Sequence, residues 1–387
     1  MSLSVGIVGL PNVGKSTLFN ALTKKQQAAA ENYPFCTIEP NSSIVEVKDS
    51  RLEALAKIDG TSQIIRATVE FTDIAGLVKG ASKGEGLGNK FLANIRECDA
   101  ILHVVRCFEN DDIIHVQEGG NKSAPIDPVG DAEVIETELV LADMEQLQRR
   151  YERVRKEAQA KPTVRPEAEA CEALLKHLEE GKSVRSFPRA EGDAILPVLK
   201  ELRFLTDKPV IFCANVSEDD VSGGDNAHVA ALREYASKQG CQTVVICAQM
   251  EADLAGLDEA EAKEFLDSYG LTESSLDRTI KLAYDTLGLA SYFTSGVKET
   301  HAWTFKRGWK APQCAGVIHT DFEKGFIRAE VVAYDDYVKY NGTSGARAAG
   351  ALRPEGKAYE MQDGDVVEWR FTCDLGNDIG GGYAVGG

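Results

Sequence analysis

Residues 4–17 of this 387-residue chain read SVGIVGLPNVGKST, an apolar run followed by a glycine-containing loop. The stretch from Gly9 to Ser16 fits the pattern G-x-x-x-x-G-K-[ST] between an expected strand (residues 4–10) and an expected helix (residues 16–25), the context in which this pattern binds phosphate. Backbone N–H groups of such a loop point at phosphate oxygens, and the helix N-terminus adds partial positive charge. We expect the amine of Lys15 to reach the β- and γ-phosphates and the Ser16 hydroxyl to ligate Mg²⁺. The alternative, a glycine loop without this role, is disfavoured by the flanking strand and helix.

A second phosphate-sensing element is expected where the alternating segment 66–73 ends. The sequence DIAG runs from Asp73 to Gly76 and fits D-x-x-G. The Asp73 carboxylate can hold Mg²⁺, usually through water, and the Gly76 N–H can sense the γ-phosphate. Thr37, in NYPFCTIEP, is placed where a mobile loop would supply a second hydroxyl to Mg²⁺. An ordinary turn stabilised by the threonine hydroxyl is the alternative for Thr37.

The base is expected to be read by the segment Asn215-Val216-Ser217-Glu218, which ends the apolar segment 209–215. GTP-binding proteins of this architecture carry N-K-x-D here, and the Asp carboxylate accepts hydrogen bonds from N1–H and N2–H₂ of guanine. In this chain Val216 replaces the Lys and Glu218 replaces the Asp. Adenine presents a lone pair at N1 and has no N2 amine, so a displaced Glu218 suits adenine, while Asn215 can still bond the base. Unpaired polar groups in a base pocket cost about 1–3 kcal/mol each. We therefore predict ATP over GTP; the alternative is a simple turn at the end of the strand.

Strands and helices alternate along residues 4–107 and 209–247, which predicts a mostly parallel, doubly wound α/β sheet. Between these parts lies a charged helical stretch in which Val140, Met144, Leu147, Tyr151, Val154 and Ala158 repeat at heptad spacing. Prolines in 161–166 end that helix. A second helix near 167–180 carries an apolar stripe of Cys171, Leu174 and Leu178, so an antiparallel hairpin inserted into the α/β domain is expected. It is either a solvated structural arm or an arm that docks a partner.

From about residue 279 the pattern changes to short alternating segments (301–306, 314–319, 327–332 and 366–371), which indicate a small α+β domain. Upstream, Ser50 and Glu53 have the spacing of a helix capping box. The last residues, GNDIGGGYAVGG, are too rich in glycine to pack well, so a flexible tail is expected.

Composition excludes several classes of protein. Hydrophobic residues are 43% and charged residues 27% of the chain, which leaves room for a sizeable core. The net charge of −18 disfavours non-specific coating of nucleic acid. The N-terminus lacks the basic region of a signal peptide, and no apolar run is long enough to span a membrane. The nine cysteines form no C-x-x-C pair, so reduced thiols and a cytoplasmic location are expected.

Together these motifs resemble one family. The segments GLPNVGKST, ENYPFCTIEP, DIAGLVKGASKGEGLGN, NVSE and AGVIHTDFEKGFIRAE are similar to those of the YchF/Obg-like ATPases, in the Obg branch of translation-factor GTPases. The resemblance covers about residues 3–372. It implies a Ras-like P-loop domain (3–120 and 206–278), an inserted helical coiled-coil arm (121–205), a C-terminal ubiquitin-like, β-grasp TGS domain (279–372) and a tail (373–387).

The resemblance also implies roles for single residues. The phosphates would be held by Asn12, Val13, Gly14, Lys15, Ser16 and Thr17. Ser16 and Thr37 would bind Mg²⁺, and Asn215–Glu218 would read adenine, with Val216 lining the base.

Hydrolysis is expected to be slow without a further group. Many related GTPases have a glutamine after D-x-x-G that orients the attacking water, but this chain has Leu77 there. The resemblance points to a histidine in a mobile loop, which matches His115 in NDDIIHVQEG. An imidazole can position or deprotonate water near neutral pH. An ordinary surface histidine is the alternative for His115, and His103, within an apolar strand, is expected to be a core residue.

The resemblance implies ATP hydrolysis with Mg²⁺ as cofactor. It also implies binding to the ribosome, through the large subunit or the whole particle and with rRNA contact. We expect a monomer without membrane association. Two other functions stay open: a GTPase of the same fold, and a ribosome-binding module whose hydrolysis is incidental.

Overall fold

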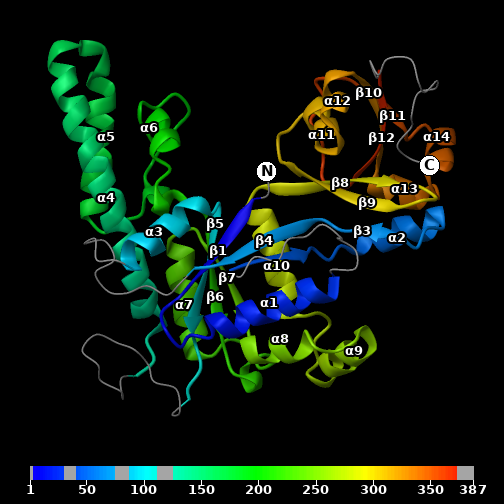
Figure 1. Ribbon diagram of the computed structural model, residues 1–387, viewed down its shortest axis with the longest axis horizontal. Coiled ribbons are helices and arrows are strands. Elements are labelled where there is room, and N and C mark those ends of the chain that lie inside the picture. Colours follow the sequence, from blue (N-terminus) through cyan, green and yellow to red (C-terminus); the bar gives the residue numbers. More distant parts are fainter. Residues whose placement is uncertain (1–2, 30–40, 75–86, 111–124, 373–387) are drawn as a thin grey trace. The chain divides into compact units, whose positions relative to one another are not determined.

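The computed structural model describes residues 3–29, 41–74, 87–110 and 125–372. Its chain forms two compact units (Figure 1). The first contains residues 3–28, 41–45 and 70–279 of the described part, and the second contains residues 46–69 and 280–372. Segment 46–69 therefore leaves the first unit, packs with the C-terminal residues, and returns. Within the described ranges, no helix is both long and apolar enough to cross a lipid bilayer.

The first unit is built on a six-stranded sheet with the order β2-β4-β1-β5-β6-β7. Its strands are β1 (Ser4–Val8), β2 (Ser42–Glu46), β4 (Thr68–Asp73), β5 (Ala100–Arg106), β6 (Val210–Asn215) and β7 (Gln242–Ile246). The pairs β1–β4, β1–β5, β5–β6 and β6–β7 are parallel, which confirms the prediction from alternating strands and helices. Every residue of β5 and β6 is buried, as strands covered on both faces require.

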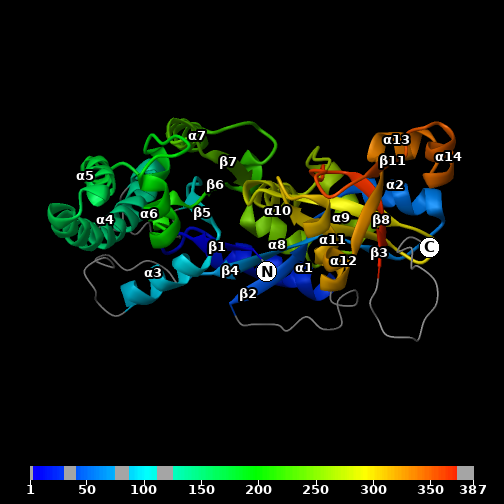
Figure 2. The ribbon, with the colours of Figure 1, turned by 90° about the horizontal axis from the view of Figure 1, so that it is seen from above.

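The first unit also contains the helices that follow. They are α1 (Lys15–Ala29), α3 (Leu87–Glu97), α4 (Pro128–Ala160), α5 (Arg165–Glu179), α6 (Ile195–Leu202), α7 (Ala227–Lys238), α8 (Ala248–Leu254), α9 (Glu259–Ser268) and α10 (Ser275–Thr286), the last of which continues into the second unit. One core cluster joins α3, the first part of α4 and α7 to β1, β5 and β6. Helix α7 lies along β6 and β7 (Figure 2).

Helices α4 and α5 lie side by side (Figure 1) and bury one apolar seam. The heptad residues Val140, Leu147, Val154 and Ala158 are buried there, and Met144 and Tyr151 pack against them. Across the seam Cys171, Leu174 and Leu178 are buried. A single 3₁₀ turn, Pro162–Val164, reverses the chain between the two helices, as the prolines predict.

The second unit is built on another six-stranded sheet, with the order β11-β10-β12-β8-β9-β3. Its strands are β3 (Ile64–Ile65), β8 (Leu289–Ser295), β9 (Thr300–Lys306), β10 (Phe326–Ala333), β11 (Arg353–Glu355) and β12 (Asp365–Phe371). Its helices are α2 (Ser50–Asp59), α11 (Ala311–Ile318), α12 (Thr320–Lys324), α13 (Tyr334–Lys339) and α14 (Thr343–Ala348). Tyr292 and Trp369, both fully buried, meet edge to face in its core.

Two local expectations for this unit are wrong. Residues 314–319 belong mostly to α11 instead of a strand, because Pro312 lies in its first turn and Gln313 bonds back to the Lys310 N–H. The cap of α2 is Asp49, whose carboxylate accepts the N–H of Arg51, so Ser50 is the first helical residue.

Candidate functional site

The glycine-containing loop lies between the last residue of β1 and the first residue of α1. Leu18 N–H donates to the Gly14 carbonyl oxygen at 3.0 Å, so the helix begins where the loop ends. Asn12 and Gly14 have positive φ values of 65° and 95°. A Cβ at Gly9 would lie only 2.8 Å from the Val104 carbonyl oxygen. This backbone is therefore a tight cradle that side chains at Gly9 or Gly14 would fill.

Asn215, the last residue of β6, ties this cradle to another strand end on the same carboxyl edge of the sheet. Its Nδ2 donates to the Val13 carbonyl oxygen at 2.9 Å, and its Oδ1 accepts the Ala248 N–H at 3.0 Å. A Cβ on Gly14 would collide with the same Nδ2. Because each amide nitrogen carries two hydrogens, the bond to Val13 uses one of the two on Nδ2.

Asp73 ends β4, and the register of the parallel pair places it opposite Ile7 of β1. Its carboxylate forms an ion pair with the amine of Lys15, the first residue of α1. Both side chains are largely buried, with 12% of Lys15 and 24% of Asp73 exposed. The two phosphate-binding elements that the sequence predicts are thus in direct contact, although 58 residues separate them.

The donor set at this place fits Mg²⁺ bound together with a triphosphate. Ser16 is exposed in the first turn of α1, and Asp73 supplies a carboxylate on the adjacent strand. Hydroxyl and carboxylate oxygens suit Mg²⁺, which keeps several waters and is usually held with substrate phosphates. In the described ranges, no group of three or more His, Cys, Asp or Glu side chains is placed to hold a metal ion.

Three predicted site residues, Thr37, Gly76 and His115, lie outside the described residues, as do Leu77 and the C-terminal tail. Thr17 is half-buried next to Ser16 in α1. His103 lies in the core, with its ring tilted against Phe212. Burial lowers the pKa of His103 to about 3, so it is neutral at physiological pH, as expected for a core residue.

After Asn215, the chain leaves β6 and enters a 3₁₀ turn at Glu218–Asp220. Val216 is buried, and its N–H donates to the Ile246 carbonyl oxygen at 2.8 Å. The Ser217 hydroxyl donates to Asp220 at 3.1 Å, and Glu218 is the first residue of that turn. The exposed Glu218 carboxylate accepts the Tyr269 hydroxyl at 3.2 Å.

Sequence reasoning missed the two residues that orient this segment, Ala248 and Tyr269. Ala248 follows β7, which is the parallel neighbour of β6. It therefore lies at the same sheet edge as Asn215. That strand order could have identified Ala248. Tyr269 follows α9, and its distance of 51 residues from Glu218 leaves no local signal.

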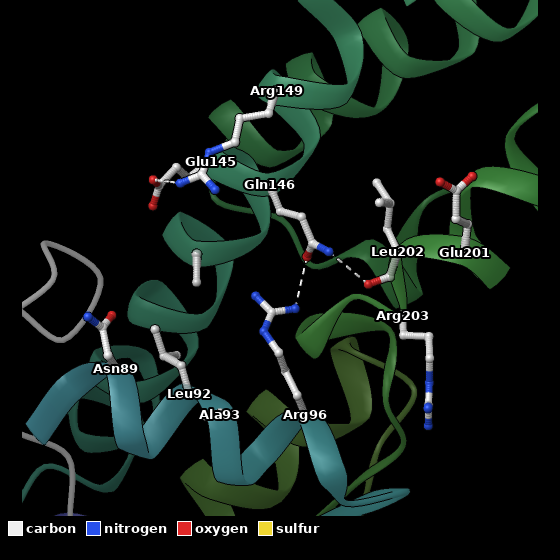
Figure 3. Close-up of a pocket in the computed structure, with 11 residues that line it drawn as sticks. Asn89, Leu92, Ala93, Arg96, Glu145, Gln146, Arg149, Glu201, Leu202 and Arg203 are labelled. Atoms are coloured by element: carbon white, nitrogen blue, oxygen red, sulfur yellow. Dashed lines mark hydrogen bonds and ion pairs between the residues drawn. The ribbon is translucent and has the colours of Figure 1, made fainter. Parts of the chain in front are cut away.

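A separate pocket of about 550 Å³ lies between α3, α4 and the end of α6 (Figure 3). Arg96 donates to the Gln146 side-chain oxygen at 2.9 Å, and the Gln146 amide donates to the Leu202 carbonyl oxygen at 2.9 Å. Glu145 and Arg149 pair along its rim. Among the described residues, those that line this pocket include no glycine. The Gln146 bridge connects α3, which follows Asp73 in sequence, to α4 and α6.

A glycine-containing cradle at the carboxyl end of β1, with the lysine and aspartate paired beside it, defines a P-loop nucleoside triphosphatase domain. Residues 4–161 match a family described as "50S ribosome-binding GTPase", and residues 289–372 match the YchF GTPase C-terminal family, described as "Protein of unknown function (DUF933)". The chain is 52% identical over 376 residues to the "Ribosome-binding ATPase YchF" of Bacillus subtilis, covering 96% of this chain and 100% of that protein. The protein of the same name from Escherichia coli O157:H7 is 50% identical over 373 residues, with the same coverage.

A solved structure of the Schizosaccharomyces pombe YchF GTPase superposes with a TM-score of 0.84 at 36% identity, covering 95% of this chain and 98% of that chain. The chain belongs to the YchF family.

Proposed function

We propose that this protein is an ATP-binding, ATP-hydrolysing switch that associates with the ribosome in the cytoplasm. The observation that carries the proposal is the cradle at residues 9–14 together with its bond to Asn215. Asn215 donates to the Val13 carbonyl oxygen and is the first residue of the segment 215–218, here called the base-reading segment. The relatives from Bacillus subtilis and Escherichia coli O157:H7 support it, since both are named ribosome-binding ATPases. The Schizosaccharomyces pombe relative is named a GTPase, so a GTPase of the same fold is the second candidate.

The phosphates lie along residues 12–17 in this proposal. Backbone N–H groups of the loop and of the N-terminus of α1 donate hydrogen bonds to the phosphate oxygens, and the helix dipole stabilises their negative charge. Lys15 exchanges part of its contact with Asp73 for the β- and γ-phosphates. Ser16 and Thr37 would hold Mg²⁺, Asp73 would hold it through water, and the Gly76 N–H would sense the γ-phosphate. When bound, the ion neutralises charge that develops on the phosphate oxygens.

The base lies between the segment from Asn215 to Glu218 and the residues after β7. Asn215 offers its remaining amide hydrogen, and the buried Val216 closes the apolar side. Cys247 is buried beside this edge, and burial raises the pKa of its thiol, so the core behind the segment carries no thiolate charge. Because Glu218 is turned toward Tyr269, adenine meets no opposing carboxylate.

His115 is the proposed group that positions the attacking water, since Leu77 cannot hydrogen-bond. Replacing His115 with alanine is expected to lower the rate of phosphate release at saturating ATP by roughly 10²-fold, the lower range of general acid–base effects. ATP affinity is expected to stay within about twofold, because uniform binding does not require the imidazole. The matched control is His319→Ala, which changes an exposed histidine in the second unit. Unchanged turnover in the His115 variant removes its catalytic role.

The nucleotide state is proposed to reach the α4–α5 hairpin, which acts as a docking arm, through α3. The bonds from Arg96 to Gln146 and from Gln146 to Leu202 link α3 to the root of this hairpin (Figure 3). Since α3 is the first described helix after the D-x-x-G element in the sequence, ordering of that element by a γ-phosphate would bias α3. The second docking region of the proposal is the TGS-type domain that the sequence predicts at residues 279–372.

Gln146→Ala tests this link. It removes both bonds and is expected to reduce the difference in ribosome affinity between the ATP-like and ADP-bound states by about threefold or more, since coupling residues contribute about 0.5–2 kcal/mol. The measurement is co-sedimentation with ribosomes over a range of protein concentrations. Gln148→Ala is the matched control, because Gln148 bonds only within α4, to Glu152, among the described contacts. Equal effects of the two variants would remove the proposed link. Ribosome binding that is identical in all nucleotide states of the unaltered protein would favour a binding module with incidental hydrolysis.

A further inference from the structure

Glu218 takes the place of the guanine-reading aspartate, but its carboxylate is held by a residue from outside the motif. The Tyr269 hydroxyl donates to Glu218 Oε2 at 3.2 Å. Both residues belong to the first unit, and Glu218 is exposed at the edge where the base-reading segment turns. The same hydrogen bond raises the pKa of Tyr269, so the phenol stays protonated and remains a donor at neutral pH.

The hydroxyl is presented by a well-defined helix end. Helix α9 begins with a reciprocal capping box between Asp258 and Glu261, with bonds of 2.9 and 3.1 Å. At its other end, the Tyr269 N–H donates to the Leu266 carbonyl oxygen at 3.1 Å. The Tyr269 ring lies 5.2 Å from the Phe265 ring, measured between centroids. Two contacts at the helix end thus fix where the hydroxyl points.

This helix end packs against the segment that follows β7. Phe265 and Tyr269 contact a buried cluster of Cys247, Met250 and Leu254. Ala248, in that same segment, donates its N–H to Asn215. The base-reading segment is therefore held at both ends from one platform: at Asn215 through Ala248, and at Glu218 through Tyr269.

The restraint on Glu218 bears directly on the choice of purine. Guanine offers two adjacent donors, N1–H and N2–H₂, to a carboxylate that turns both oxygens toward it. Adenine offers a lone pair at N1, which a free carboxylate would repel. Glutamate has one more rotatable bond than aspartate, so an unrestrained Glu218 could sample the guanine-reading position. A tyrosine hydroxyl on one oxygen occupies an acceptor site and limits that sampling.

We propose that Tyr269 is a positioning residue for nucleotide specificity: it holds the Glu218 carboxylate away from the purine edge and so disfavours GTP. This inference rests on the proposed ATP function of the same site and adds a residue outside the four-residue motif. Tyr269 acts through Glu218 and does not itself need to touch the nucleotide.

The test uses Tyr269→Phe in the full chain, which keeps the ring on its platform and removes the hydroxyl. Affinities for Mg-ATP, Mg-GTP and Mg-ITP are measured by competition with a fluorescent nucleotide. We expect ATP affinity to change by less than about twofold and GTP affinity to increase roughly tenfold, the range of one charge-assisted hydrogen bond in a base pocket. ITP has N1–H but no N2 amine, so its gain is expected to be smaller than that of GTP.

Glu218→Gln supplies the control for this mechanism. A neutral glutamine amide has only one acceptor oxygen, so it cannot accept from both guanine donors as a carboxylate can. The double variant Tyr269→Phe with Glu218→Gln is therefore expected to show no gain in GTP affinity over Glu218→Gln alone. Glu218→Asp is a second, independent variant, because the shorter side chain withdraws from the Tyr269 hydroxyl. It is expected to gain GTP affinity in the same direction.

The possible results distinguish the proposed ATP preference from the proposed role of Tyr269. Equal ATP and GTP affinity in the unaltered protein would remove the proposed ATP preference itself. If the unaltered protein prefers ATP and its ATP-to-GTP ratio is unchanged in Tyr269→Phe, the role of Tyr269 is wrong. Equal weakening of all three nucleotides would show a merely structural role and also overturn it. If Tyr269→Phe fails to fold, an unchanged ratio in Glu218→Asp overturns the inference.

Discussion

Replacement of Lys15 with alanine is expected to weaken Mg-ATP binding about 100-fold or more. Charge-assisted hydrogen bonds contribute about 1.5–3 kcal/mol, and 3 kcal/mol corresponds to roughly 100-fold in affinity. The effect is enlarged because Asp73 loses its ion-pair partner and leaves an unbalanced carboxylate where the triphosphate must lie. Isothermal titration calorimetry with Mg-ATP measures the loss.

Lys24→Ala is the matched control for this change. Lys24 is also a cation of α1, but its amine donates to the Ala252 carbonyl oxygen at 3.2 Å, away from the loop. Its removal changes the charge by the same amount and should leave ATP affinity within about twofold, since exposed charges contribute little. Similar affinities for the two variants would mean that Lys15 does not contact the phosphates.

Replacement of Gly14 with alanine is expected to abolish measurable ATP binding and to lower the free energy of unfolding by about 3–5 kcal/mol. A residue with a side chain at φ 95° is strained by roughly 1–2 kcal/mol. The new Cβ would also collide with Asn215 Nδ2 and displace it from the Val13 carbonyl and the Ala248 N–H. Unsatisfied buried groups add about 1–3 kcal/mol each. Urea denaturation and calorimetry check the two effects.

Gly240→Ala separates strain from collision. Gly240 has φ 68°, and a Cβ there would meet nothing within 4 Å. We expect a loss of only about 1–2 kcal/mol of stability, from backbone strain, with ATP affinity unchanged. If Gly14→Ala were no worse than Gly240→Ala, the close approach of Asn215 to the loop would not matter for the site.

Patterns carried by neighbouring residues were sufficient to predict much of the fold. The strand, loop and helix of residues 4–29 follow from an apolar run, two glycines and a helical pattern that are adjacent in sequence. The seam from Val140 to Ala158 was predictable because helical periodicity repeats over five turns and tertiary contacts only reinforce it. The buried strands β5 and β6 were recognisable as short apolar runs.

Features that depend on distant partners were not predictable. Residues 314–319 alternate in polarity over too few positions to distinguish a strand from a helix. Pro312 in the first turn and the capping bond of Gln313 favour the helix that forms. The cap of α2 moved by one residue because Asp49 competes with Ser50 for that role. No local pattern could show that segment 46–69 packs with the C-terminal unit.

In the candidate site, too, some contacts were predictable from the sequence and others were not. The contact between Lys15 and Asp73 was foreseeable, because both motifs end at the carboxyl edge of parallel strands. The bond of Asn215 to Val13 spans 202 residues and depends on how loops converge at the sheet edge, so sequence spacing could not reveal it. Thr37, Gly76 and His115 lie outside the described residues, and their roles stay predictions.

The most direct test is the equilibrium affinity of the purified, unaltered chain for ATP, GTP, CTP and UTP, each with Mg²⁺. ATP should bind most tightly, with GTP weaker by about tenfold or more, the discrimination of one mismatched polar group. Tighter or equal binding of GTP would contradict the assignment of the purine, and failure of all four to bind would contradict the phosphate cradle.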